Sequence, residues 1–320
     1  MNKTVFLTDY AWPDDSVERA VIEGAGFRLV TGPAAPLPAT EIEDLVKEHR
    51  PHAIMTCWAQ VSSEAIAAAP ELRIVARLGV GLDNIAVSTA TSRDIVVTNV
   101  PDYCVEEVSD HAVGFALAWT RGLVHFDREV RAGRWVPSSA KLLRLSELTV
   151  GIIGFGRIAR ATARKLAAFH CELLAHDPYV MTSEGSIEFV SLEDLLARSD
   201  IAIVHLPLKD STHRLINRER LGKMKAGGLL INVSRGGIVD TDAVIEALQS
   251  GHLSAAALDV LESEPAVPGE LLEQPGAMLS PHVAFSSDAS LIELRRRAAE
   301  EVVRVLRGEA PRNPCNQTAK

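Results

Sequence analysis

Short apolar runs alternate with segments of helical periodicity along most of the chain. This alternation is typical of βαβ units, in which helices connect parallel strands. Within the first hundred residues, a capped helical pattern covers Asp15–Gly26, and three prolines mark a loop over Thr31–Ala39. The runs that predict buried strands are Thr4–Asp9, Ala53–Cys57, Arg73–Gly79 and Ile95–Val100. This part of the sequence predicts one small α/β unit.

A second alternating series follows a long helical pattern at roughly Val105–Ala132. From about Ser286 the chain is helical again. The strands predicted in this series are Val150–Gly154, Glu172–His176, Ile201–Leu206, Leu229–Val233, Ala255–Asp259 and Ala277–Ser280. Six strands with intervening helices match the doubly wound fold that binds dinucleotides.

The turn after the first strand of the second series has the pattern Gly-x-Gly-x-x-Ala. Gly154 permits the tight turn, Gly156 lets the backbone approach a pyrophosphate, and Ala159 is small enough for close packing of helix on strand. The N-terminus of the following helix offers backbone N–H groups to the phosphates. Asp177 ends the next strand, about 20 residues further on, where an acid binds a ribose 2′-hydroxyl. Because this acid would repel a 2′-phosphate and no arginine stands beside it, the sequence predicts NAD rather than NADP.

Three further side chains follow later strands of the same series, at the edge where ligands bind in open α/β sheets. Arg235 can hold a carboxylate with two parallel hydrogen bonds. His282 is a natural proton donor or acceptor near neutral pH, and a carboxylate such as Glu264 beside it favours its charged form. We expect Gly236 and Gly237 to keep space open around the arginine. Together with a dinucleotide turn, these residues predict hydride transfer to or from a carboxylate-bearing substrate.

The composition of the chain limits which classes of partner and which cellular location we expect. The chain has 320 residues, enough for two domains, and its formal net charge of −9 argues against nucleic-acid binding. No apolar run is long enough for a membrane helix, and the N-terminus lacks the pattern of a signal peptide. The four cysteines are scattered without C-x-x-C spacing, so we expect neither a disulfide framework nor a metal site. A cytoplasmic protein with reduced thiols is the resulting expectation.

The motifs GFGRIA, HDPY, HLPL, NVSRGGIVD, ALDVLESEP and SPHVA occur in this order. In these motifs the sequence resembles the D-isomer-specific 2-hydroxyacid dehydrogenases over nearly its whole length. The segment Asn99–Gly114 is most similar to the branch with C-terminal-binding proteins and phosphoglycerate dehydrogenase-like members. The resemblance implies an α/β fold with two Rossmann-like domains and a cleft between them. Residues 100–285 would form a doubly wound NAD-binding domain, and residues 1–99 with 286–320 a smaller flavodoxin-like substrate domain.

The resemblance also implies roles for the matching residues, and a homodimer built largely on the cofactor domain. Arg235 would bind the carboxylate and carbonyl of a 2-oxo acid, His282 would be the general acid/base, and Glu264 its partner. The substrate-binding residues would be Arg77, Val80, Gly81, Arg235 and His282. The residues around NAD would be Gly154, Phe155, Gly156, Arg157, Ile158, Asp177, Pro178, Leu206, Pro207, Thr212, Val233, Ser234, Arg235, Asp259, His282 and Ala284.

The leading hypothesis is an NAD-dependent D-2-hydroxyacid dehydrogenase whose partner is a small 2-oxo or 2-hydroxy acid. A phosphoglycerate dehydrogenase-like enzyme is an alternative, because Arg77 could meet a phosphate. Another alternative is an NAD-sensing, co-repressor-like protein that keeps the fold and acts through partner proteins. The segment after His282, Val283–Phe285, lacks the tryptophan often present in the nearest branch, which leaves the identity of the substrate open.

Overall fold

A computed structural model describes residues 3–180 and 185–318 of the chain, which form two compact units. Unit 1 combines the N-terminal residues up to Tyr103 with the C-terminal residues from Ser287, and unit 2 is Cys104–Ser286. The two boundaries thus follow Tyr103 and Ser286, whereas the sequence places them after residues 99 and 285.

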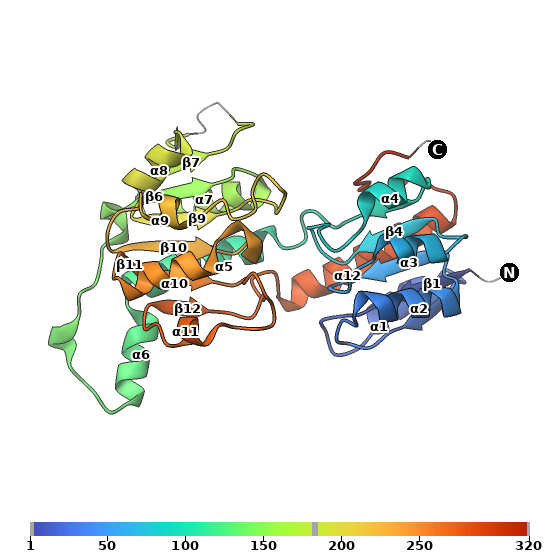
Figure 1. Ribbon diagram of the computed structural model, residues 1–320, viewed down its shortest axis with the longest axis horizontal. Coiled ribbons are helices and arrows are strands. Elements are labelled where there is room, and N and C mark those ends of the chain that lie inside the picture. The colour runs from blue at the N-terminus through green and yellow to red at the C-terminus, as the bar shows by residue number, and fades with distance from the viewer. Residues whose placement is uncertain (1–2, 181–184, 319–320) are drawn as a thin grey trace. The chain divides into compact units, whose positions relative to one another are not determined.

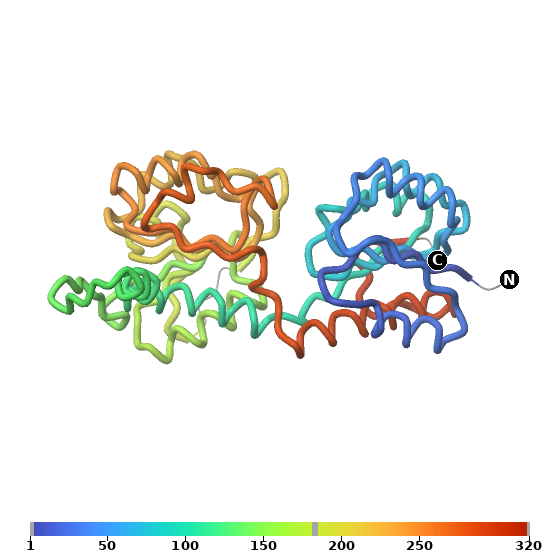
Figure 2. The backbone as a smooth tube through the Cα atoms, turned by 90° about the horizontal axis from the view of Figure 1, so that it is seen from below, coloured from blue at the N-terminus to red at the C-terminus, as the bar shows by residue number. Residues whose placement is uncertain are grey.

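Unit 1 contains a five-stranded parallel sheet with helices on both faces (Figure 1). Its strands are β1 (Thr4–Leu7), β2 (Arg28–Thr31), β3 (Ala53–Thr56), β4 (Ile74–Arg77) and β5 (Val96–Thr98). Its helices are α1 (Ser16–Gly24), α2 (Ala39–His49), α3 (Ser63–Ala68), α4 (Val87–Ser92) and α12 (Asp288–Leu306). The strand order β2-β1-β3-β4-β5 is that of flavodoxin-like sheets. Helices α1 and α12 pack together on one face, and α2 and α3 lie on the other (Figure 2).

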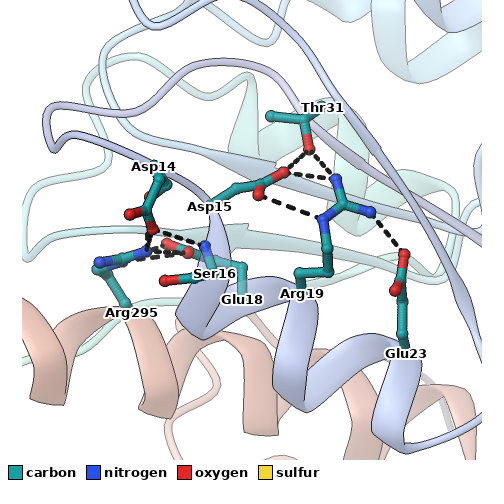
Figure 3. A network of polar contacts seen from close by, with 8 residues as sticks. All are labelled: Asp14, Asp15, Ser16, Glu18, Arg19, Glu23, Thr31 and Arg295. Carbon is teal, nitrogen blue, oxygen red and sulfur yellow. Dashed lines mark hydrogen bonds and ion pairs between the residues drawn. The ribbon is translucent and has the colours of Figure 1, made fainter.

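Both ends of the chain contribute to unit 1. The Cys315 N–H donates to the Val97 carbonyl at 2.8 Å, and the Val97 N–H donates to the Asn316 side chain at 2.8 Å, so the C-terminal residues cover the edge strand β5. Helix α12 is joined to α1 by a buried ion pair in which Arg295 donates to both carboxylate oxygens of Glu18 at 2.8–3.1 Å (Figure 3). Because either charge alone would be costly to bury, this pair fixes how the C-terminal helix packs on the N-terminal one.

Unit 2 contains a parallel sheet that has seven strands within the described residues. The strands are β6 (Thr149–Ile153), β7 (Glu172–His176), β8 (Glu188–Phe189), β9 (Ile201–Val204), β10 (Gly228–Asn232), β11 (Leu253–Leu258) and β12 (Ala277–Leu279). The helices are α5 (Val105–Thr120), α6 (Leu123–Arg131), α7 (Arg157–Ala167), α8 (Leu192–Arg198), α9 (Arg218–Leu221), α10 (Thr241–Gln249) and α11 (Gly269–Leu272). The order β12-β11-β10-β9-β6-β7-β8 reverses direction beside β6, as in a doubly wound sheet. Helices α5 and α7 pack together on one face, and α10 covers the other (Figure 2).

The structure confirms the α/β class and the doubly wound sheet, and it adds two strands that the sequence did not predict. The edge strands β2 and β8 were not expected, because both are short and partly exposed and so lack a continuous apolar run. The long helical pattern predicted at Val105–Ala132 is confirmed, and it forms two separate helices, α5 and α6. Gly122 between them adopts a φ of 59°, and a Cβ on it would lie 2.9 Å from the Phe126 ring. The left-handed backbone and the nearby ring therefore favour glycine at this break.

The cysteines are free thiols, and three of them are buried. Burial raises the pKa of the Cys57 thiol to about 12, so this thiol stays protonated at neutral pH. In the part of the chain that the structure describes, none of the helices combines the length and apolarity needed to cross a membrane. The same residues contain no group of three His, Cys, Asp or Glu side chains arranged to hold a metal ion.

Candidate active site

The glycine turn lies at the carboxyl end of β6 and opens helix α7. Gly154 has a φ of 89°, and a Cβ there would lie 2.5 Å from the His205 carbonyl oxygen, so the turn requires glycine. A Cβ on Gly156 would meet no atom within 4 Å, which leaves open space beside the first turn of α7. Ala159 is fully buried where the helix packs on the sheet. The turn has the bend, the open approach and the helix N-terminus that a pyrophosphate site requires.

The Asp177 carboxylate connects the end of β7 to this turn. One of its oxygens accepts from the Phe155 N–H at 2.8 Å, and the other accepts from the Tyr179 N–H at 2.8 Å. Each carboxylate oxygen can accept a further hydrogen bond, so the acid can still receive a ribose hydroxyl. Among the described residues no cation forms an ion pair with Asp177, and Pro178 and Tyr179 beside it are exposed. Within the described residues, no ion pair therefore competes with a ligand for this carboxylate.

The segment that follows β9 forms a closed turn. The Thr212 hydroxyl donates to the Pro207 carbonyl at 2.7 Å and accepts from the Lys209 N–H at 2.8 Å. At the start of the segment, the His205 Nε2 lies 3.0 Å from the Thr162 hydroxyl of α7. Desolvation lowers the pKa of His205 to about 4, so this imidazole is neutral at physiological pH. The sequence reasoning missed His205, although its position directly after a buried strand was a usable signal.

Arg235 follows β10 in a turn built around a buried asparagine. The Asn232 side chain is fully buried; it accepts from the Ser234 N–H at 3.1 Å and donates to the Arg235 carbonyl at 3.0 Å. The Ser234 hydroxyl donates to the Val204 carbonyl of the neighbouring strand at 2.7 Å. These bonds fix the backbone from which the arginine side chain extends. Ser234, which the sequence assigns to the cofactor, thus also joins two strand ends.

The expectation that the glycines after Arg235 keep space open is wrong for Gly236. A Cβ on Gly236 would lie 1.9 Å from the Leu261 carbonyl carbon, whereas one on Gly237 would meet only side-chain atoms, at 3.3 Å or more. The first glycine is needed because the turn after β10 packs directly on the backbone after β11. That second segment carries Glu264. The loops of the arginine and the glutamate are therefore in backbone contact.

Glu264 and His282 form a hydrogen-bonded pair, with 2.8 Å between Glu264 Oε2 and His282 Nδ1. The other oxygen of Glu264 accepts from the Leu261 N–H at 2.9 Å. Burial acts to raise the pKa of Glu264, but the hydrogen bond and charge of His282, the Leu261 N–H and the charge of Arg235 outweigh it and lower that pKa. The carboxylate therefore stays ionised at neutral pH. With Nδ1 directed at the carboxylate, Nε2 is the ring nitrogen that is positioned for proton exchange.

Asp259 supports the loop that carries this histidine. Its side chain is nearly completely buried. Its backbone carbonyl accepts from the His282 N–H at 2.8 Å, and its carboxylate accepts from the Val283 and Ala284 N–H groups at 2.9 and 3.0 Å. The sequence assigns Asp259 and Ala284 to the cofactor but does not indicate this supporting role.

The expected substrate residues of unit 1 lie at the carboxyl end of β4. Arg77 is only 5% exposed; its guanidinium carbon lies 5.7 Å from the centre of the Trp58 ring, and its Nη1 donates to the carbonyl of the next residue. The buried Nε of Arg77 has no hydrogen-bond partner among the described residues. A Cβ on Gly79 would lie 2.7 Å from Nη1, so glycine is what lets the guanidinium fold over the turn. Val80 and Gly81 follow in the same turn.

Comparisons with known proteins agree with this geometry. The model of the NAD-binding domain of D-isomer specific 2-hydroxyacid dehydrogenases matches residues 113–284, over half of the chain. The chain belongs to this family. The glycine turn, the open space at Gly156 and the charge of Asp177 fit the pyrophosphate and ribose of its nicotinamide dinucleotide.

Relatives in the family have several activities. A D-3-phosphoglycerate dehydrogenase of Mycobacterium leprae is 40% identical over 252 residues, which are 78% of this chain and 48% of that protein. The chain thus spans about half the length of this relative. A glyoxylate reductase of Thermofilum pendens is 38% identical over 280 residues, covering 84% of this chain and 83% of that one. The crystal structure of an NADPH-dependent glyoxylate/hydroxypyruvate reductase from Sinorhizobium meliloti, in complex with NADP and malonate, has a TM-score of 0.86 at 32% identity, covering 98% and 97% of the two chains.

Proposed function

We propose that the protein is a D-2-hydroxyacid dehydrogenase that reduces a small 2-oxo acid and oxidises the corresponding D-2-hydroxy acid. The observation that carries this proposal is the Glu264–His282 hydrogen bond of 2.8 Å, in loops packed against the turn of Arg235. A titratable imidazole with a fixed carboxylate partner and a nearby arginine is the set that an oxo-acid reductase needs. Bound NADH supplies the hydride.

In the reduction, His282 donates the proton to the oxygen that becomes the hydroxyl group. Glu264 holds Nδ1 and stabilises the charged imidazole, so the proton to be transferred is on Nε2. Arg235 binds the substrate carboxylate and polarises the adjacent carbonyl group. In the oxidation the same imidazole, now neutral, accepts the proton.

The cofactor that this site favours is NAD. The Asp177 carboxylate lies beside the glycine turn, where it would repel a 2′-phosphate. Replacing Gly156 with alanine tests cofactor binding without disturbing the fold, because the new methyl group meets no protein atom within 4 Å. We expect Gly156→Ala to keep its melting temperature and to bind NADH at least about tenfold more weakly. The matched change Gly154→Ala lowers the melting temperature as well, because its Cβ meets a carbonyl oxygen.

The activity is tested by NADH oxidation with a panel of oxo acids, with NADPH in parallel. The panel includes glyoxylate, hydroxypyruvate, pyruvate, phenylpyruvate and 3-phosphohydroxypyruvate. His282→Asn should abolish turnover and leave NADH binding intact. Undiminished turnover in this variant would refute the assignment. Tight NADH binding by the unaltered protein without turnover of any acid would favour the co-repressor-like alternative instead.

We further propose that Arg77 binds a second anionic group of the substrate, which favours a phosphoglycerate dehydrogenase-like preference. Support comes from its burial without an ion-pair partner among the described residues, since a buried guanidinium is stable only with hydrogen bonds or a counter-charge. Arg77→Met should lower kcat/KM for 3-phosphohydroxypyruvate about 100-fold, and that for glyoxylate far less. Equal losses for both acids would assign the arginine to the shared carboxylate or to folding.

A homodimer is the assembly that we propose. The segment 121–144 of unit 2 exposes apolar side chains, among them Trp135 at 78% and Val136 at 53%. A patch of this kind marks an interaction surface. Trp135→Glu should convert the dimer to a monomer in light scattering after size-exclusion chromatography. The control is Ile292→Glu, which changes an equally apolar exposed residue on α12, 56% exposed, and should leave the dimer intact.

We also propose that the protein resides in the cytoplasm. All four of its cysteines are free thiols and three of them are buried, as is common in proteins that fold under reducing conditions. Fractionation of cells that produce the protein would test this location.

A further inference from the structure

The backbone at the proposed acid/base residue has an unusual conformation. His282 has a φ of 52°, in the left-handed region that non-glycine residues rarely occupy. Such a conformation persists only where the surroundings impose it. Here three consecutive N–H groups, those of residues 282–284, all donate to Asp259. The direction of the His282 side chain therefore depends on where the Asp259 carboxylate is held.

Two further side chains hold that carboxylate in place. The Ser280 hydroxyl donates to Asp259 Oδ1 at 2.5 Å. On the other side of the serine, His111 Nε2 of helix α5 lies 2.9 Å from the same hydroxyl and 3.8 Å from Asp259 Oδ1. Because the serine hydroxyl has one proton and gives it to the carboxylate, His111 Nε2 must be the donor to the serine oxygen. Phe115, one turn further along α5, packs edge-on against the His111 ring with the ring centres 4.6 Å apart.

We propose that His111 and Ser280 are positioning residues for the acid/base histidine. They form a chain of hydrogen bonds from α5 through Ser280 to Asp259, and Asp259 then sets the backbone of the His282 loop. Helix α5 packs against α7 and β10, so the chain of bonds starts from a helix held by the rest of unit 2. Loss of an anchor would let the imidazole rotate out of line with the substrate, and small displacements of a reacting group cost much in rate. This inference rests on the proposed role of His282.

A double-mutant cycle tests the proposal. His111→Phe keeps a ring against Phe115 and removes the donor, and Ser280→Ala removes the middle of the chain. Each change should lower kcat about tenfold, while the dissociation constant for NADH changes less than about twofold. Because both act through one path, the double variant should lose no more than about twofold beyond Ser280→Ala alone. His111→Gln, whose amide can still donate to the serine, should recover most of kcat.

A matched control is available on the same helix. The Trp119 Nε1 donates to the Ser254 hydroxyl at 3.0 Å, so Trp119→Phe also removes one bond from α5 to a serine, but far along the helix from His111. It should leave kcat unchanged.

Three results would overturn the inference. The first is that His111→Phe lowers kcat by the same factor in the unaltered protein and in the Ser280→Ala variant, which would mean that the two effects are independent. The second is that the variants change only the melting temperature, and the third is that Trp119→Phe reproduces the loss of kcat. Failure of the proposed function is distinguished by His282→Asn. If that variant keeps full turnover, the acid/base assignment fails; if it abolishes turnover while the His111 and Ser280 variants have no effect, only the positioning role fails.

Discussion

Replacing Glu264 with glutamine isolates the effect of one charge on proton transfer. Glutamine preserves the shape of the side chain and can still accept a hydrogen bond from His282 Nδ1, 2.8 Å away in the native protein. The negative charge that stabilises the protonated imidazole is lost. Reduction requires the protonated form of His282. Without the charge of Glu264 this form is lost at lower pH, so the basic limb of the pH profile for reduction moves to lower pH.

The size of this shift follows from the geometry. At 2.8 Å, two unit charges attract by about 1.5 kcal/mol in bulk water and by about 6 kcal/mol at an effective dielectric constant of 20. Because the side chain of Glu264 is 36% exposed, solvent screening keeps the value near the lower limit. The charge interaction lost in Glu264→Gln is therefore about 1.5 kcal/mol, and the basic limb should move to lower pH.

The assay is kcat/KM for oxo-acid reduction measured across the pH range, with the oxidation reaction as a second direction. Oxidation requires neutral His282 as the base. In the variant the imidazole is neutral down to lower pH, so the acid limb of the oxidation profile should move to lower pH by the same amount. Glu262→Gln is the control, since Glu262 pairs with Arg214 at 2.9 Å. A basic limb that does not move in Glu264→Gln, or that moves as far in Glu262→Gln, would refute the reasoning.

Three other perturbations have expected outcomes. Gly236→Ala places a methyl group against the backbone of Leu261, and it should lower the free energy of unfolding by about 1–3 kcal/mol and abolish most of the activity. A variant that is as stable in urea as the unaltered protein would contradict this packing. The pKa of His205 is about 4 in the folded protein and about 6.5 in the unfolded chain, so the free energy of unfolding falls as the pH decreases from 6.5 to 4. Urea titrations at these two pH values should show that the fall is smaller in His205→Gln, by at most about 3 kcal/mol. Arg295→Met leaves Glu18 buried without its partner and should cost about 3–5 kcal/mol. Arg19→Met, which breaks partly exposed pairs with Asp15 and Glu23, should cost at most about 1 kcal/mol.

Much of the site was predictable because its residues belong to local patterns. The turn at Gly154 and Gly156 is defined by neighbours in sequence, and so is the position of Asp177 at the end of the next strand. The charged residues at strand ends were predictable for the same reason, because parallel strands bring their carboxyl ends to one edge. The reason for Gly236 was not predictable, since the atom that forbids a side chain there belongs to Leu261, which follows another strand.

The sequence by itself determined the α/β class, the two series of strands, the dinucleotide turn and the residues Arg235, Glu264 and His282, because each depends on periodicity or on a short motif. Only the tertiary structure decided which of these residues touch. The bond between Glu264 and His282, the three N–H groups on Asp259 and the donor at His111 join segments that are far apart in sequence. Sequence spacing does not encode such contacts, because they are set by how strands pair and how loops pack on one another.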